Sequence, residues 1–346
     1  MALSLTGSWG RRFTRLAIAL GLLLLVAAPV MRFWVTPVLA QSPEVPGGDG
    51  FVTHVSTGTI TTLFDLETAE SQAIEPIPVT RTESTRGDAA ATKEAAATGV
   101  NAAVTDTTDR TVTEDGRLIA EQESRLAADR RTQALVDCCG VQVGDVTVPM
   151  AGSGSPLRLP WFIPEQAYPY FDLTLLAPVE MSYIGQEEVG GITAMKFQQA
   201  SSPTPIGAVQ APGVLIGSPL PAVPLVRTHV VNRTLWADPT TGIILRKVER
   251  IREALRDSTG TDVVTLLAMT TASTPEQVDA QVALATQEGR RVLWVHSYGP
   301  MLAVGVGLLL LMIGIVGIIV RTRAARVEED FPDELASFDD LREAFD

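Results

Sequence analysis

Two adjacent cysteines, Cys138 and Cys139, are the residues of this chain whose chemistry stands out first. They are the only cysteines among 346 residues, so the sequence is not that of a disulfide scaffold. Outside the cytoplasm thiols tend to oxidise, and a bond between neighbouring cysteines would close a small, strained ring. The pair is therefore a disulfide candidate that would lower the intact mass by two hydrogen atoms. Free buried thiols are the alternative interpretation.

No pattern typical of an enzyme accompanies these cysteines. His54, His229 and His296 are scattered, and adjacent thiolates would bind one zinc ion only with strain. The segment 152–155 (GSGS) lacks the spacing of a nucleophile elbow. The carboxylates of 187–188 are more typical of a solvated turn than of an acid–base pair. We therefore expect no catalytic residue, no metal and no cofactor, with a hydrolase that uses an unrecognised site as a minor alternative.

A group of aromatic residues and a long uncharged stretch are the candidate binding features. Residues 197–226 contain no charged side chain and six prolines, which prevent a regular helix. In one interpretation the aromatic group lines a lipid groove or touches the bilayer; in the other it covers the core of a β domain. The candidates for binding a lipid or a partner are Trp161, Phe162, Tyr168, Tyr170 and Phe171.

The composition limits the classes of partner. The net charge is −13, and most of the negative charge lies in residues 41–298. Such an acidic surface argues against binding to nucleic acid and against strong docking on anionic lipid headgroups. The middle of the chain is rich in Thr, Val, Ala, Gly and Pro, which favours strands and loops over helices.

An apolar segment near the C-terminus, 299–320, has no charge and is long enough to cross a bilayer as a helix. Arg321, Arg323 and Arg326 follow at once, and the positive-inside rule puts that end in the cytoplasm. Trp294 and Tyr298 precede it, as expected at a membrane–water boundary. The chain before residue 299 is therefore expected to lie outside the cytoplasm.

A second apolar run, 16–35, follows three arginines near the N-terminus. It fits either an uncleaved transmembrane helix or a signal peptide cut after 38–40. Arg32 and the distance to Ala40 fit a cleavage region badly, so the anchor is preferred. We expect a plasma-membrane protein with two spans, both termini cytoplasmic and the bulk extracytoplasmic.

Residues 41–298 are expected to form a β-rich, mostly antiparallel domain between the two terminal helices, which gives a membrane-anchored α+β fold. Hairpins are predicted at Asp115–Gly116 and at Gly190–Gly191. A helix over 275–287 is predicted to begin at Thr274, with Gln277 three residues on.

An internal echo suggests a duplication within this domain. Residues 126–136 and 235–245 share Leu, Ala, Asp and Thr at the same spacing. Each is expected to form strand, turn and strand, with Asp129 or Asp238 closing the turn through its carboxylate. Common hairpin chemistry is the alternative explanation.

The cytoplasmic end, 321–346, is acidic. Large apolar residues recur at helical spacing over 331–345, which gives one apolar stripe on an acidic helix. Such a helix would dock on a cytosolic partner, and a frayed tail is the alternative.

Three segments, 128–132 (ADRRT), 137–140 (DCCG) and 234–242 (TLWADPTTG), together with the two terminal spans, resemble an actinobacterial membrane-protein family labelled PorA porin. The resemblance covers roughly residues 10–320 and implies an envelope protein with a large extracytoplasmic domain. It carries over no catalytic residue. Gln133 departs from the pattern, because a turn glycine is expected there.

The porin label conflicts with the predicted spans, since a membrane β-barrel needs many strands with an apolar lipid-facing side. Two helices enclose no pore, so conduction would require an oligomer. The small residues Ala17, Gly21, Ala303, Gly307 and Gly314 would allow the spans to pack closely.

A weaker resemblance links 183–192 (YIGQEEVGGI) and 235–238 (LWAD) to half-barrel lipoprotein carriers, in which a curved antiparallel sheet cups an acyl chain. The preferred hypothesis is a non-enzymatic envelope protein whose exterior domain binds or transfers a lipid, a glycolipid or an envelope partner. An oligomeric channel is the second hypothesis.

Overall fold

The computed structural model describes residues 8–44, 51–66, 70–71 and 75–330. The chain divides into two compact units, Met1–Leu39 with Arg291–Asp346, and Ala40–Arg290. The second unit ends at Arg290, whereas the sequence predicts a domain over 41–298. The apolar stripe predicted for 331–345 lies outside the described residues.

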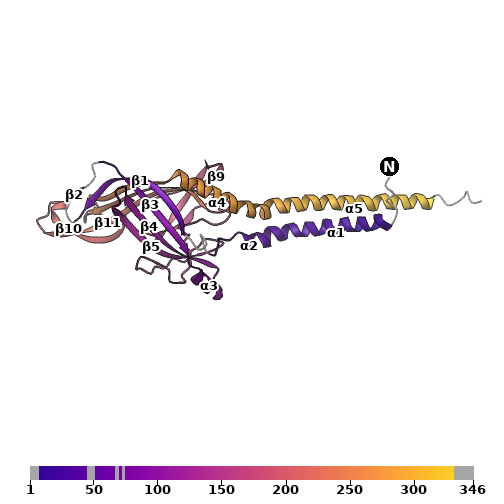
Figure 1. Ribbon diagram of the computed structural model, residues 1–346, viewed down its shortest axis with the longest axis horizontal. Coiled ribbons are helices and arrows are strands. Elements are labelled where there is room, and N and C mark those ends of the chain that lie inside the picture. The colour runs from indigo at the N-terminus through magenta and orange to yellow at the C-terminus, as the bar shows by residue number, and fades with distance from the viewer. Residues whose placement is uncertain (1–7, 45–50, 67–69, 72–74, 331–346) are drawn as a thin grey trace, which may run out of the picture. The chain divides into compact units, whose positions relative to one another are not determined.

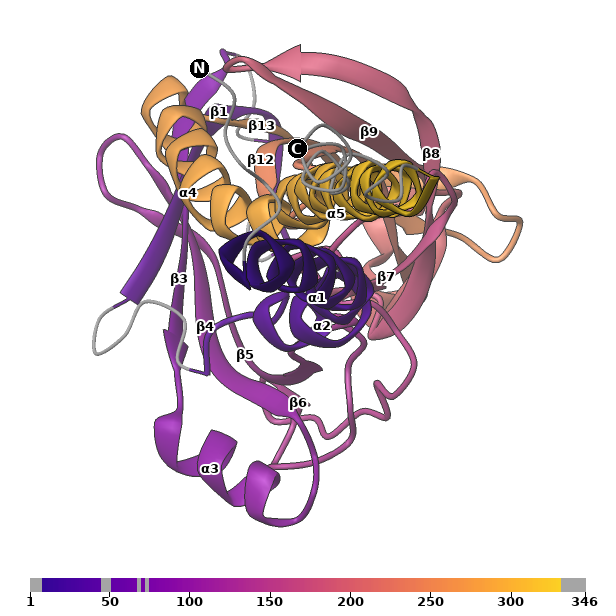
Figure 2. The ribbon, with the colours of Figure 1, turned by 90° about the vertical axis from the view of Figure 1, so that its right-hand side faces the viewer.

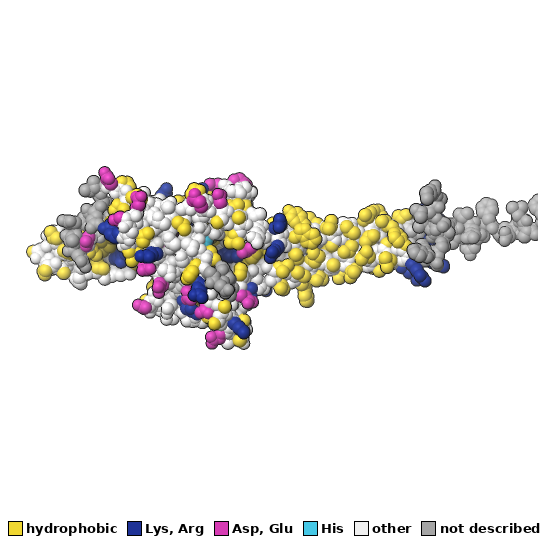
Figure 3. Space-filling view, viewed as in Figure 1, with side chains coloured by type: hydrophobic (Ala, Val, Ile, Leu, Met, Phe, Trp, Pro, Cys, Tyr) yellow, Lys and Arg dark blue, Asp and Glu magenta, His cyan; other side chains and the backbone are white. Residues whose placement is uncertain are grey.

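Two long helices form the first unit. Helix α1 (Ser8–Val30) continues through a π-helical turn (Met31–Val35) into α2 (Thr36–Leu39), and helix α5 (Gly299–Asp330) comes after a π-helical turn at Trp294–Tyr298. The segments Arg11–Leu39 and Pro275–Arg323 are each long and apolar enough to cross a membrane. Figure 3 shows apolar side chains over the surface of these helices, which suggests association with a membrane.

Glycines allow α1 and α5 to approach closely. A Cβ added to Gly21 would lie 2.8 Å from the carbonyl oxygen of Gly307, and one added to Gly307 would lie 3.0 Å from that of Gly21. Gly314 packs against the side chain of Ile18. The predicted close packing of the two helices is confirmed, and at Gly21 and Gly307 it rests on backbone contact where larger residues would clash.

The second unit is a curled antiparallel half-barrel, shown in Figures 1 and 2. Its strands pair in the order β6-β5-β4-β3-β1-β13-β12-β11-β9-β8-β7, while β10 pairs with β11 and β2 with β1. The bounds are β1 Phe51–Asp65, β2 Glu70–Ser71, β3 Ile77–Gly87, β4 Ala102–Thr113, β5 Leu118–Asp129, β6 Gln142–Val143, β7 Tyr168–Asp172, β8 Ala177–Val189, β9 Ile192–Ala200, β10 Thr204–Pro212, β11 Ala222–Ala237, β12 Ile244–Arg256 and β13 Asp262–Ser273.

The strand signals of the sequence are confirmed where turn chemistry is strong. Gly116 lies at φ 87° between β4 and β5, and Gly190 and Gly191 lie at φ 58° and 83° between β8 and β9. Only glycine adopts such angles without strain, which fixes the register of both hairpins.

The two echoed segments fold into turns with the same hydrogen bonds. The amide of Gln133 donates to the carbonyl of Asp129 over 2.9 Å, and that of Gly242 donates to the carbonyl of Asp238 over 2.9 Å. Both aspartate carboxylates also accept from the backbone inside the turn, over 2.7 Å to Thr132 and to Thr241. Gln133 adopts φ 57° where Gly242 has φ 75°, so it occupies the glycine position of the turn.

The chain takes different paths after the two turns. After the Asp238 turn it enters β12, as the sequence predicted. After the Asp129 turn only isolated bridges form, such as Ala128 with Leu135, so the second strand predicted there is wrong. The chain pairs instead with a later loop, where the Leu135 amide donates to the Ser153 carbonyl over 2.7 Å.

Helix α4 (Pro275–Leu293) begins as predicted and runs longer than the predicted 275–287. The Gln277 amide donates to Thr274 Oγ1 over 3.2 Å. The Gln277 side chain leaves the helix end and contacts β1, where its Oε1 accepts from the Val55 amide over 3.2 Å. The sequence analysis missed α3 (Ala89–Ala97), whose first turn is capped by Asp88 accepting from the Ala91 amide over 2.9 Å.

Candidate functional site: a cavity in the half-barrel

A cavity of about 330 Å³ lies inside the β unit, against the concave face of the sheet. Its walls come from β1, β3, β4 and β5 on one side, and from α4, the start of β12 and the loop after residue 154 on the other. The lining residues are Ser42, Pro43, Val52, His54, Thr85, Ala103, Thr105, Leu126, Ala128, Gln133, Ser155, Leu157, Arg158, Ile243, Ile244, Gln281, Leu284 and Glu288.

Small side chains at alternate strand positions leave this space open. Ala103 of β4 pairs with Ala128 of β5, and Thr105 pairs with Leu126. Positions two apart on a strand point to the same side of a sheet, so all four face the cavity. The alternation therefore builds a largely apolar wall with little volume of its own.

Several polar side chains line this space, and Gln281, Thr105 and His54 are three of them. Gln281 of α4 is 7 % exposed and Thr105 is 6 % exposed, and no hydrogen bond of either side chain is present within the described residues. The Nδ1 atom of His54 accepts from Gln277 Nε2 over 3.0 Å, which leaves the hydrogen of a neutral ring on Nε2. Burial lowers the pKa of His54 although Glu83 opposes this, so the ring is neutral at pH 7.

Arg158 lines the cavity from the loop after residue 154. Its guanidinium lies 4.6 Å from the ring centre of Trp161, donates from Nε to the Thr241 carbonyl over 2.8 Å, and pairs with Glu288 over 2.9 Å. The arginine is thereby held between the Asp238 turn and helix α4, and its charge is matched inside the protein.

Next to the cavity, the concave face carries a layer of buried ion pairs, which we call the charged layer. Glu249 of β12 accepts from both Arg81 of β3 and Arg233 of β11. Arg81 also bonds Asp109 over 2.9 Å from its Nε, and Arg233 bonds Asp172 over 3.2 Å. The charged layer therefore links strands from both sides of the sheet.

The charged layer continues toward the cavity. Lys247 donates to Glu83 over 2.9 Å. Burial alone would raise the pKa of Glu83 and of Glu249, but the neighbouring Lys247 and arginines outweigh it and hold both pKa values below the ordinary range. These carboxylates are ionised at pH 7, and their charges are taken up by the cations around them.

A comparison with known families decides the classification. The family model described as Porin PorA matches residues 13–316, which is most of the chain. The chain belongs to the PorA porin family. A search of the curated proteins found no match. Family membership agrees with the resemblance seen in the sequence and with the two candidate membrane helices, which lie at the ends of the matched region.

In this PorA-family chain the predicted aromatic group lies mainly in the core. Tyr168 and Tyr170 are buried and pack with Met181 and Phe197, and Phe171 packs in a separate cluster with Leu126. Arg233 lies 4.4 Å from the ring centre of Tyr170, and burial raises the pKa of Tyr170 to about 12.

Trp161 and Phe162 are half-buried, and Trp161 stacks with Arg158. The five aromatic residues are absent from the lining of the cavity among the described residues. Their placement is that of the core-covering interpretation, and a role for them in binding a ligand stays a prediction.

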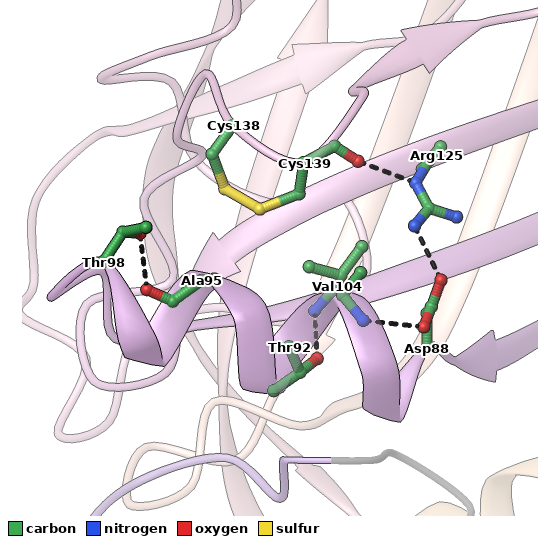
Figure 4. Close-up of a disulfide and its surroundings, with 9 residues drawn as sticks. Asp88, Thr92, Ala95, Thr98, Val104, Arg125, Cys138 and Cys139 are labelled. Atoms are coloured by element: carbon green, nitrogen blue, oxygen red, sulfur yellow. Dashed lines mark hydrogen bonds and ion pairs between the residues drawn. A yellow bond between two sulfur atoms is a disulfide. The ribbon is translucent and has the colours of Figure 1, made fainter.

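The two cysteines are joined by a disulfide, shown in Figure 4. Cys139 has φ 62°, and its carbonyl accepts from Arg125 Nε over 2.9 Å. Arg125 in turn pairs with Asp88, the cap of α3, over 2.7 Å. The disulfide turn is thus tied to β5 and to α3, and neither cysteine lines the cavity.

No group of three or more His, Cys, Asp or Glu residues that would hold a metal is found in the part of the chain that the structure describes. The sequence analysis also missed the cavity residues Gln281, Thr105 and Ala103. A signal was present for Gln281, because it lies at helical spacing between the apolar residues Val278 and Ala285.

Proposed function

We propose that this chain is a non-enzymatic, membrane-anchored protein whose half-barrel binds a lipid or glycolipid by its acyl chain. The observation that carries the proposal is the cavity itself. Its volume of about 330 Å³ lies in the range of ligand pockets, and its wall surface is mostly apolar although polar side chains also line it.

Packing energetics support a ligand over a plain defect. Protein interiors are close-packed, and the atoms that line an empty apolar space lose van der Waals contacts. Ala103, Ala128 and Leu126 face such a space while the neighbouring charged layer is tightly paired. An acyl chain between β4, β5 and α4 would restore those contacts.

In this proposal α1 and α5 hold the half-barrel at the outer face of the plasma membrane, with both chain ends in the cytoplasm. The arginines after residue 320 support this orientation, and the disulfide suits an oxidising compartment. The bilayer would then be both the anchor and the source of the ligand.

Mass spectrometry of lipid extracted from the purified full chain tests the proposal. The informative variant is Ala103→Phe, which puts a ring into the cavity from β4. Ala97→Phe on α3 is the matched control, because Ala97 is exposed and lies outside the cavity lining. Lipid bound to the two apolar helices is expected equally in the wild type and in both variants, so it forms the background of the measurement.

We expect about one acyl lipid per chain beyond that common background in the wild type and in Ala97→Phe, and its loss in Ala103→Phe. An equal lipid content in all three proteins, with all three folded by circular dichroism, would overturn the proposal.

The second candidate is an oligomeric channel, favoured by the family description Porin PorA. Since a pair of helices encloses no pore, several copies would have to assemble around one. Reconstitution of the full chain into planar bilayers distinguishes the candidates: stepwise solute conductance would support the channel, and its absence at high protein density would favour the lipid-binding protein.

A further inference from the structure

Gln281 is a polar side chain in a place that favours an apolar one. It lies on α4 between Val278 and Ala285, which pack on the core cluster around Trp236 and Leu245. Its side chain lines the cavity and also a smaller recess of about 30 Å³ beside His54, Glu83 and Lys247. Only 7 % of the residue is exposed, and its amide forms no hydrogen bond within the described residues.

The amide has no partner among the described residues but is not fully enclosed, so it is reached from the cavity and can bind a ligand that displaces water there. The amide offers two hydrogens and a carbonyl oxygen. The hydroxyl of Thr105 is in the same situation across the cavity, and the Nε2 hydrogen of His54 is a third group at this end. All three are uncharged hydrogen-bonding groups on the wall of one cavity, and Gln281 and His54 also share the smaller recess.

The charges around this site are already matched. Arg158, the one arginine or lysine among the residues that line the cavity in the described structure, is paired with Glu288. Lys247, which reaches the smaller recess, is paired with Glu83. An ionised headgroup placed here would lose its hydration without gaining an unpaired counter-ion.

We infer that the cavity selects a ligand whose acyl chain ends in an uncharged hydroxyl or carbonyl group, as in a monoacylglycerol, over an ionised fatty acid. Gln281 is the specificity-determining residue: its amide binds the ligand hydroxyl or ester carbonyl, with Thr105 and His54 as further partners. This inference rests on the proposed binding of acyl lipids and names the class of lipid.

Photocrosslinking of the full chain in nanodiscs tests the inference. Two probes carry the same diazirine-bearing palmitoyl chain, one as monopalmitoylglycerol and one as palmitate at alkaline pH, where the carboxylate is ionised. The yield of covalent adduct on peptides of β4, β5 and α4 is measured by mass spectrometry for each probe over a range of concentrations.

In the wild type, monopalmitoylglycerol is expected to label these peptides at a concentration about tenfold lower than palmitate. The variant Gln281→Leu is expected to lose this preference while still labelling with both probes. Gln287→Leu, an exposed change on the same helix, is the matched control and should keep the wild-type preference.

The outcomes separate the two claims. Equal labelling by both probes in the wild type, or stronger labelling by palmitate, would overturn the role of Gln281 and leave acyl binding intact. A preference that survives in Gln281→Leu would overturn it as well. If neither probe labels the cavity peptides in the folded wild type, the proposed function itself fails.

Discussion

Polar side chains inside the half-barrel include two contrasting kinds: some are paired with opposite charges, and others have no partner in the described part of the chain. In the charged layer each of the carboxylates Glu83, Asp109, Asp172 and Glu249 contacts a cation, and Glu249 contacts two. A short distance along the sheet, Gln281 and Thr105 face a cavity without a partner among the described residues. In the charged layer the charges are matched, although Nε2 of the adjacent Gln199 has no partner in the described residues, whereas the cavity is hollow.

This difference distinguishes the part of the sheet that ion pairs hold together from the part that leaves space for a cavity. Ion pairs between β3, β11 and β12 link the two sides of the curled sheet, so they fix its curvature. The small side chains of β4 and β5 leave unfilled space beside these ion pairs. A hollow region beside a network of ion pairs is typical of a binding site on a rigid support.

The largest effect is expected in the charged layer. Glu249→Gln keeps the volume but removes the charge that Arg81 and Arg233 share, which should lower the free energy of unfolding by about 3 kcal/mol, as for other buried pairs that lose one partner. Urea denaturation followed by tryptophan fluorescence measures it. Glu121→Gln, at an exposed position of β5, is the control and should stay within about 0.5 kcal/mol.

The same substitution at two buried glutamines should have opposite signs. Gln199→Leu removes an acceptor that receives a hydrogen bond from Arg233 over 2.6 Å and should cost about 2 kcal/mol. Gln281→Leu removes an unpartnered amide and should stabilise the lipid-free protein by about 1 kcal/mol. Destabilisation by both, measured by urea denaturation, would contradict the contrast between the two regions.

Acid should act on the two regions in separate pH ranges. The pKa of His54 is lowered by burial, so the unfolded chain takes up that proton first and stability begins to fall as the pH drops below about 6.5. Burial would raise the pKa of Glu249, but Arg81 and Arg233 lower it; its share of stability is present above pH 4.5 and is lost as the pH falls further.

Urea midpoints measured from pH 8 to pH 3 test this order. His54→Asn should flatten the first decline, even though Glu83 and Lys247 also face that ring. Glu249→Gln should flatten only the second decline. If either variant flattened the other decline instead, the assignment of that pH-dependent loss of stability to its group would be wrong.

The smallest effect on stability is expected from filling the cavity. Ala103→Phe adds a ring where the structure has space, so the free energy of unfolding should change by less than about 1 kcal/mol. A loss of several kcal/mol would mean that the space is not available to a ligand of that size. Differential scanning fluorimetry beside Ala97→Phe suffices for the comparison.

Much of the fold can be predicted from local patterns in the sequence. The candidate membrane helices are visible as long apolar runs, and the hairpins at Gly116 and Gly190 as glycines where φ must be positive. The cap at Thr274 and the Asp238 turn are also local, since each is completed by backbone groups within a few residues.

The site depends on residues that are far apart in the chain. Arg81 and Glu249 are 168 positions apart, and Gln281 meets β4 and β5 only because the sheet curls. Residue type alone predicted a binding site at the aromatic residues of 161–171. The cavity is instead lined by small residues and by the amide of Gln281, which lies on a mostly apolar helix face. Gln133 shows the limit at a turn: its side chain bonds Ser42 over 2.8 Å, a contact that helps to offset its left-handed backbone and that no local pattern predicts.

The most direct test of the account is a crystal structure of the full chain purified from its native membrane without delipidation. We predict elongated density along Ala103, Leu126 and Leu284, with a polar end within hydrogen-bond distance of the Gln281 amide. A cavity collapsed by the neighbouring side chains, or one that holds only ordered water, would contradict the claim that the half-barrel is built to bind an acyl lipid.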